Sequence, residues 1–167
     1  MCTCATGLTN YVSQNYGAHR LHRIRRGFVD CMLITSALTA LFVAVCEVFA
    51  EPLVGIFMEE GAGTAFAVES GALYVRIVAP FFFVVNVKIN ADATVRGCNG
   101  NLGFMISTFS DLILRVVFVF ILTIPFGFAG VGWAWAAGWG LGTVVALAFY
   151  FTIPVSVSYT HLTLPTT

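Results

Sequence analysis

Two pairs of oppositely charged residues lie inside long apolar stretches of this chain. Lys88 and Asp92 are four residues apart, and so are Asp111 and Arg115. Residues at this spacing share one face of an α-helix, where an ammonium or guanidinium group can reach a carboxylate. Ionisable groups at membrane depth are costly and usually face a protein interior or a wet cavity, so they indicate a pathway for a substrate or an ion.

Uncharged polar residues occupy the same stretch as the first pair. Asn86, Asn90 and Thr94 are again four apart, and at about 100° per residue their face lies about 160° from the charged one. A helix that faces lipid cannot carry polar residues on nearly opposite sides, so we expect protein or a cavity around it. The resulting pathway candidates are Asn86, Lys88, Asn90, Asp92, Asp111 and Arg115.

Both charge pairs have a structural and a functional interpretation. In the structural one, each pair is a salt bridge that fixes helix packing. In the functional one, a carboxylate binds a cation or a proton and later releases it. A carboxylate paired with Lys or Arg keeps its negative charge, so Asp92 and Asp111 would take up a proton only if the partner moves away.

The composition predicts an integral membrane protein. Of the 167 residues, 59% are hydrophobic and only 10% are charged, whereas soluble domains carry about a quarter charged residues. About 20 apolar residues suffice to cross a bilayer as a helix. We therefore expect an all-α, polytopic bundle of about five transmembrane helices. The stretches of sufficient length are 28–49, 74–95, 102–124 and 131–154.

Proline and glycine refine the boundaries of these helices. Pro80 predicts a kink near residues 76–80, because proline removes one backbone hydrogen bond. Pro52 suits the start of a short interfacial helix. Gly138 and Gly142 form a GxxxG pair, which lets helices approach closely. The expected helices are a first one ending near Tyr16, then 21–50, 52–58, 64–94, 102–124 and 130–151.

Loop charges predict the orientation in the membrane. Basic residues mark the first connection and the third, which holds Arg96, whereas the second is acidic and the fourth (125–127) is short. Because cytoplasmic loops carry the excess of Lys and Arg, the first and third connections are expected inside. The basic cluster in the first connection and the start of the next helix consists of His19, Arg20, His22, Arg23, Arg25 and Arg26, and the acidic residues around the second connection are Glu51, Glu59, Glu60 and Glu69.

Several classes of function are disfavoured. The five cysteines are scattered without the ligand spacing of a zinc site, and small apolar fillers explain them. The net charge is zero, which does not suggest a nucleic-acid partner. No Ser–His–Asp or Cys–His set falls at a common depth, so we expect neither an enzyme nor a cofactor.

A series of short motifs along residues 6–153 resembles the multidrug and toxic compound extrusion (MATE) family. Each motif alone is weak, but their order, spacing and loop charges agree with the family. One departure is Cys98–Asn101, where the family commonly has Gly-Ala-Gly-Asp. The motifs are Val12–Ala18, Tyr74–Pro80, Val95–Gly97, Leu114–Arg115 and Gly130–Trp135 with Gly138–Trp139.

The resemblance implies a twelve-helix transporter of two six-helix lobes in the inner (plasma) membrane. Such proteins expel cationic, amphipathic compounds in exchange for sodium ions or protons. The chain is similar to the end of helix eight through helix twelve, so the N-terminal lobe of the same protein would be its partner. The family's coupling acid is not carried over to any residue here.

Both ends of the chain carry separate expectations. Residues 1–154 are expected to be part of the C-terminal lobe, and the Thr-rich tail 155–167 resembles translated adapter sequence unrelated to the rest. Residues 1–16 are expected to pack poorly, because their neighbours are absent. A single lobe is expected to transport nothing by itself.

Two alternative functions stay open. A flippase of the same superfamily would export a lipid-linked oligosaccharide or polysaccharide precursor and would need a more basic cavity. A non-transporting membrane scaffold would use the charge pairs only to lock helices together.

Overall fold

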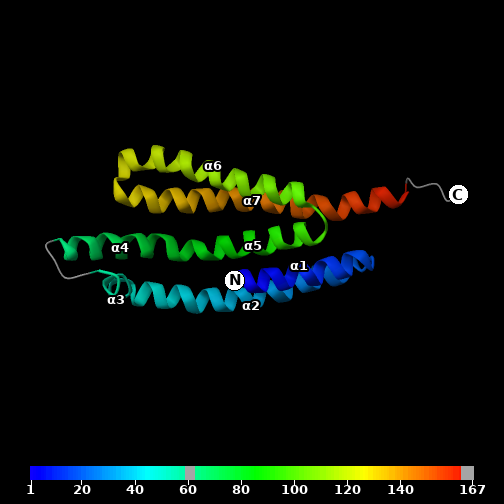
Figure 1. Ribbon diagram of the computed structural model, residues 1–167, viewed down its shortest axis with the longest axis horizontal. Coiled ribbons are helices and arrows are strands. Elements are labelled where there is room, and N and C mark those ends of the chain that lie inside the picture. The colour runs from blue at the N-terminus through cyan, green and yellow to red at the C-terminus, as the bar shows by residue number, and fades with distance from the viewer. Residues whose placement is uncertain (59–62, 163–167) are drawn as a thin grey trace.

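The computed structural model describes residues 1–58 and 63–162, with side chains described up to Thr152 (Figure 1). Within these residues the chain is helical apart from its connecting turns. Glu59 and Glu60 of the acidic connection lie outside the described residues. The elements are α1 (Cys2–Gly17), α2 (Leu21–Val48), α3 (Ala50–Gly55), α4 (Thr64–Val78), the 3-10 turn η1 (Ala79–Phe81), α5 (Phe82–Gly97), α6 (Asn101–Phe126) and α7 (Phe128–Leu162).

Among the described residues, four segments are long and apolar enough to cross a membrane. They are α2, the continuous segment Thr64–Gly97 formed by α4, η1 and α5, then α6, and Phe128–Thr152 of α7. The expected all-α transmembrane bundle is confirmed, and the protein is a multi-pass membrane protein whose partner is the lipid bilayer.

Pro80 interrupts the second of these segments as expected. The α-helical pattern gives way to a 3-10 turn at Ala79–Phe81 and resumes at Phe82. Pro80 has no N–H to donate, so the regular ladder of backbone hydrogen bonds cannot pass through it. Near Pro52 the prediction is only roughly right, because α3 begins at Ala50 and ends at Gly55 rather than at Met58.

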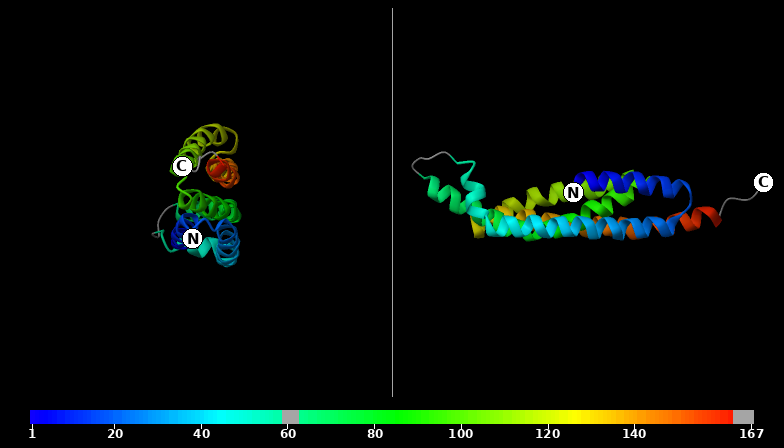
Figure 2. Two further views of the ribbon diagram at one scale, coloured as in Figure 1. Left: turned by 90° about the vertical axis from the view of Figure 1, so that its right-hand side faces the viewer. Right: turned by 90° about the horizontal axis from the view of Figure 1, so that it is seen from below.

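The helices lie side by side along the long axis of the molecule (Figures 1 and 2). α7 packs against α4, α5 and α6, while α5 packs against α1, α2 and α7. The connections α1–α2 and α5–α6 lie at one end of the bundle, and α3–α4 and α6–α7 lie at the other (Figure 1). Successive connections thus alternate between the two ends, and the two basic connections share one end, as the loop charges predicted (Figure 1).

The outer surface of the bundle is apolar and its interior is partly polar. Leu33, Ile113 and Phe120 are more than half exposed, as residues that face lipid should be. Asn86, Asn90 and several charged residues are instead buried between helices. This distribution fits a bilayer as the surrounding solvent, in which polar groups must find their partners inside the protein.

The expectation that residues 1–16 pack poorly is wrong. Ala5, Leu8 and Val12 of α1 are buried in a cluster with residues of α2 and α5. The contact is close because α5 presents Gly97 to α1, and a Cβ at Gly97 would lie 2.7 Å from the Val12 side chain. Small residues on α5 thus supply the neighbours that the prediction assumed to be absent.

The last helix runs beyond its expected end at Phe151. Its backbone continues through Pro154 to Leu162, so it includes part of the Thr-rich tail. α6 and α7 are joined at Gly127, whose φ of 55° with ψ of −134° lies in a region that residues with a side chain rarely adopt. This glycine lets the chain reverse directly from one transmembrane helix into the next.

At the end opposite the basic connections, Arg76 of α4 binds Glu51 of α3. The distance from Arg76 Nη2 to Glu51 Oε1 is 3.0 Å. Both side chains are largely exposed, so the pair contributes little to stability and mainly orients α3.

Candidate functional site

Both predicted ion pairs form. Lys88 Nζ lies 2.7 Å from Asp92 Oδ2 within α5, and Arg115 Nη2 lies 2.7 Å from Asp111 Oδ2 within α6. The first pair is almost completely buried and the second is mostly buried. The α1–α2 and α5–α6 connections lie at the end of the bundle that carries the basic residues, called the basic end (Figure 1). At about 1.5 Å per residue, Lys88 and Asp111 are about 14 and 15 Å along their helices from this end, which is about half of the thickness of a hydrocarbon core.

Glycines of α7 bring the two pairs together. A Cβ placed on Gly142 would lie 3.0 Å from Lys88 Cε and 2.9 Å from Asp111 Cβ. Two atoms this close to one point are neighbours, so the α5 pair and the α6 pair meet at Gly142. One turn earlier, a Cβ on Gly138 would lie 3.1 Å from Arg115 Cβ. The GxxxG pair therefore contributes to helix packing within the chain, as predicted. Because Gly138 and Gly142 have no side chain, the charged residues of α5 and α6 can lie directly against the backbone of α7.

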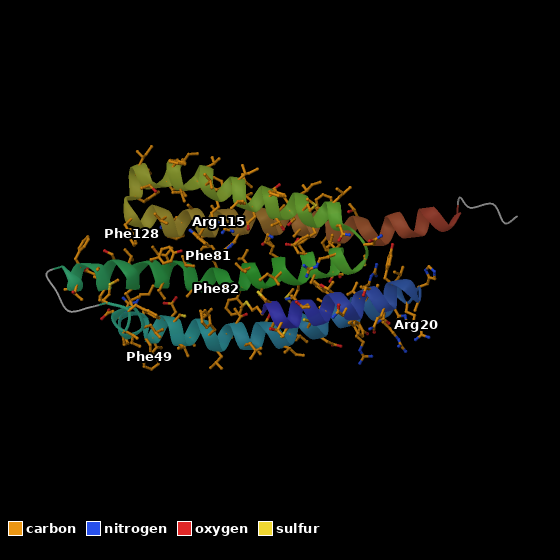
Figure 3. All side chains as sticks on the ribbon, viewed as in Figure 1. Arg20, Phe49, Phe81, Phe82, Arg115 and Phe128 are labelled. Carbon is orange, nitrogen blue, oxygen red and sulfur yellow. The ribbon has the colours of Figure 1, made fainter. Side chains whose placement is uncertain are left out.

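The guanidinium of Arg115 lies on two tryptophan rings of α7. Its Cζ is 4.2 Å from the centre of the Trp135 ring and 5.8 Å from that of Trp139. The two rings pack edge to face, with their centres 5.4 Å apart. A cation over an indole face is stabilised by the ring quadrupole, and more so away from water. Arg115 is thus held by a carboxylate and an aromatic pair midway along the bundle (Figure 3).

The aromatic partners of Arg115 were not predicted. Tryptophan is typical of membrane interfaces, but Trp139 is buried at the depth of the ion pairs. Trp135 is half-buried beside it. The spacing of four residues between the last two tryptophans was the signal, since it places both rings on one face of α7.

Several polar atoms in this region are buried without a hydrogen-bond partner among the described residues. They include one oxygen of each carboxylate, Asp92 Oδ1 and Asp111 Oδ1, and the Nε of Arg115. An unsatisfied charged oxygen in a nonaqueous interior is expensive and is retained only where it has a use or an additional ligand. The cluster can therefore accept a further cation or proton donor at two carboxylate oxygens.

The opposite face of α5 carries the predicted asparagines, and these meet α2. Asn86 Nδ2 donates to Ser36 Oγ at 3.0 Å, and Asn90 Nδ2 donates to Thr35 Oγ1 at 3.1 Å. Asn90 Nδ2 also lies within hydrogen-bond distance of Asn86 Oδ1. The two polar faces of α5 therefore both contact protein, as predicted, but they contact different helices and do not form one site.

Two further polar residues connect this region to its neighbours. Thr143 of α7 donates to the backbone carbonyl of Val84 at 3.2 Å, which ties α7 to α5 beside Gly142. Arg96, on the same predicted face as Lys88, instead donates to Thr9 Oγ1 of α1 at 3.2 Å and lies over the ring of Phe104. The charge cluster thus ends at Asp92 and does not extend to the basic end.

Among the described residues, no three His, Cys, Asp or Glu side chains are placed to hold a metal ion. Cys98, between α5 and α6, is buried under α1, and burial raises the pKa of its thiol to about 11. It is therefore an unreactive packing residue.

Comparison with known proteins identifies the family. A family profile described as MatE matches residues 1–121, which is more than half of the chain. No curated protein and no solved structure matches. The matched region contains both ion pairs and the asparagine face of α5. It is a family of transporters and not of enzymes, and this chain belongs to it as a MatE family member.

Proposed function

We propose that the complete protein is a secondary active efflux transporter of the plasma membrane, which exchanges cationic, amphipathic compounds for sodium ions or protons. The observation that carries this proposal is the charge cluster at Gly142. Its two carboxylates each have one oxygen without a hydrogen-bond partner among the described residues. Their positions along α5 and α6 correspond to about half of a hydrocarbon core. Transporters place coupling-ion and substrate sites at this depth.

In this proposal Asp92 and Asp111 bind the transported cations. Lys88 and Arg115 act as internal counter-ions that occupy the carboxylates when no other cation is bound. An incoming ion or substrate competes with them, so its binding releases a side chain within the cluster. The released Lys88 or Arg115 side chain can then compete for the other carboxylate and weaken the binding of the second transported cation. Exchange requires this mutual weakening, because coupling between two binding sites is reciprocal.

Each residue of the predicted pathway has a part in this proposal. The four charged residues form the exchange site, whereas Asn86 and Asn90 hold α5 against α2 and fix its rotation. The partner required for alternating access is the N-terminal lobe of the same protein, which would rock against this lobe around the cluster.

The alternative of a flippase for lipid-linked sugars is less well supported. Such substrates carry phosphates, which need a surplus of basic groups. The cluster instead contains two cations and two carboxylates, so its formal charge is balanced. Efflux of a cationic dye and translocation of a lipid-linked oligosaccharide, measured in parallel in proteoliposomes, would separate the two functions.

The decisive experiment compares Asp92→Asn and Asp111→Asn in the complete transporter. We expect each variant to be destabilised, and its folded fraction purified in detergent to show at least tenfold less efflux of a cationic dye. Asn90→Ala, on the other face of the same helix, is the matched control and should transport normally. If both aspartate variants transport normally and only their thermal stability falls, the pairs lock helices together and the scaffold interpretation holds for them.

A further inference from the structure

A polar pocket lies at the basic end of the bundle, outside the charge cluster. It has a volume of about 380 Å³ and is lined by Tyr11 of α1 and by His22, Arg23, Arg26 and Asp30 of α2. These side chains come from the last turns of α1 and the first turns of α2, beside the connection that carries Arg20 (Figure 3). Basic pockets between helices at this level of a membrane bind the headgroups of anionic lipids.

An apolar groove continues from this pocket toward the middle of the membrane. It has a volume of about 310 Å³, runs between α1 and α2, and shares Tyr11 and Asp30 with the polar pocket. The rest of its lining is small or apolar, and consists of Cys4, Gly7, Leu8, Gly27, Cys31 and Ile34. A headgroup-sized polar pocket joined to an apolar groove matches the two parts of a phospholipid.

Tyr11 separates the two cavities and is held in place by α2. Its ring lies directly against Gly27, where a Cβ would overlap the ring atoms, and its hydroxyl donates to the Arg23 carbonyl at 3.4 Å. A tyrosine with an apolar body and a polar tip prefers the interface between hydrocarbon and headgroups. Its position therefore marks the level at which a lipid phosphate would lie.

The charge around the pocket favours an anion. Arg20, Arg23, Arg25 and Arg26 are all exposed near the start of α2, and the first turn of this helix contains no acidic residue. Within the described residues, Arg26 is the one of the four that forms an ion pair, with Asp30 at 3.9 Å. At that distance, and with both side chains exposed, the pair leaves most of the positive charge available.

We propose that this pocket and groove bind one anionic phospholipid of the cytoplasmic leaflet. Its phosphate contacts Arg23 and Arg26, and one acyl chain lies in the groove along Gly7 and Ile34. Asp30 accepts hydrogen bonds from headgroup hydroxyls, as in phosphatidylglycerol. The site is independent of the exchange chemistry at Gly142 and would hold α1 against α2 at the membrane surface.

The test uses the purified chain in nanodiscs and measures binding of spin-labelled phosphatidylglycerol against a phosphatidylcholine background. We expect Arg23→Gln with Arg26→Gln to reduce the preference for phosphatidylglycerol about tenfold. Arg20→Gln with Arg25→Gln is the matched control, because it removes the same charge from the same segment without altering the pocket. Equal losses in the two double variants would overturn the proposal in favour of a diffuse attraction to the surface.

A second arm tests the groove and the source of the phosphate. Gly7→Leu adds a side chain where no atom lies within 4 Å of the new Cβ, so it should fill the groove and weaken lipid binding severalfold. Gly17→Leu adds the same side chain to α1 outside the groove and should have no effect. If inorganic phosphate or glycerophosphoglycerol displaces the lipid at similar concentrations, the groove plays no part and the proposal fails.

Discussion

The two polar faces of α5 have the same spacing of residues but different surroundings. On the face toward α2, the amides of Asn86 and Asn90 donate to hydroxyls at ordinary distances, and the oxygen without a partner among the described residues, Asn90 Oδ1, is neutral. On the face toward α6 and α7, Lys88 and Asp92 pair with each other while Asp92 Oδ1 has no partner among the described residues. A face whose donors are satisfied by a neighbour suits a permanent contact. A face that holds a charged oxygen without a hydrogen-bond partner suits a contact that is exchanged for another one.

The largest effect should follow from leaving one buried charge unpaired. Lys88→Met keeps the length of the side chain but leaves Asp92 without its cation, at a cost of about 3–5 kcal/mol. Lys88→Met combined with Asp92→Asn removes both charges and should recover most of that loss. Thermal unfolding of the purified chain in detergent measures both. Equal destabilisation by the single and double variants would show that the pair is not the source of the effect.

The second effect tests whether bare backbone at Gly142 is needed. Gly142→Ala places a methyl group 2.9 Å from Asp111 Cβ, which cannot swing away as the end of the Lys88 side chain can. We expect a loss of about 1–3 kcal/mol, as for other overpacked sites. Gly140→Ala, two residues away, meets no atom within 4 Å and should be neutral or slightly stabilising. Unfolding of the two variants side by side provides the comparison, and an equal response would remove Gly142 from the site.

A smaller effect is expected on the amide face. Asn90→Ala removes the donor to Thr35 Oγ1 and should destabilise the chain by about 0.6 kcal/mol, the average for a hydrogen bond between membrane helices. The exposed Asn10→Ala on α1 is the control and should change stability little. Loss of dye efflux in a folded Asn90→Ala transporter would contradict the division of α5 into a structural and an exchanging face.

The smallest change concerns α1, which also packs against α5. Because the pKa of the Cys98 thiol is about 11, only about a thousandth of it is thiolate at pH 8, and α1 also covers it. In variants that keep a single cysteine, Cys98 should react with iodoacetamide at least a hundredfold more slowly than the exposed Cys2. Its rate should rise as the pH approaches 11. Similar rates at pH 8 would show that α1 does not cover this side of α5.

The sequence predicted the parts of the site better than their assembly. Spacing alone placed Lys88 beside Asp92 and Asp111 beside Arg115, because helical geometry is local and both members of each pair lie on one helix. The break at Pro80 was equally predictable, since it follows from one missing N–H.

The meeting of the two pairs could not be predicted, because it depends on the register of α7 against α5 and α6. A GxxxG pair indicates close packing but does not say which helix fills the space. Trp135 and Trp139 show the same limit, since hydropathy places them near a membrane and only the neighbouring Arg115 explains their burial. The packing of α1 was mispredicted for a similar reason, as small residues of α5 lie far from it in the sequence.

The 3-10 turn at Ala79–Phe81 divides the transmembrane segment Thr64–Gly97 into two parts with different surroundings. The outer part, α4, packs against α3 and α7, has few buried residues, and forms an exposed and weak pair with α3, Arg76 with Glu51. The inner part, α5, packs against four helices, α1, α2, α6 and α7, and most of its residues are buried. We therefore expect that a tilt of α4 would bend the segment at Pro80 and move Lys88 and Asp92 little.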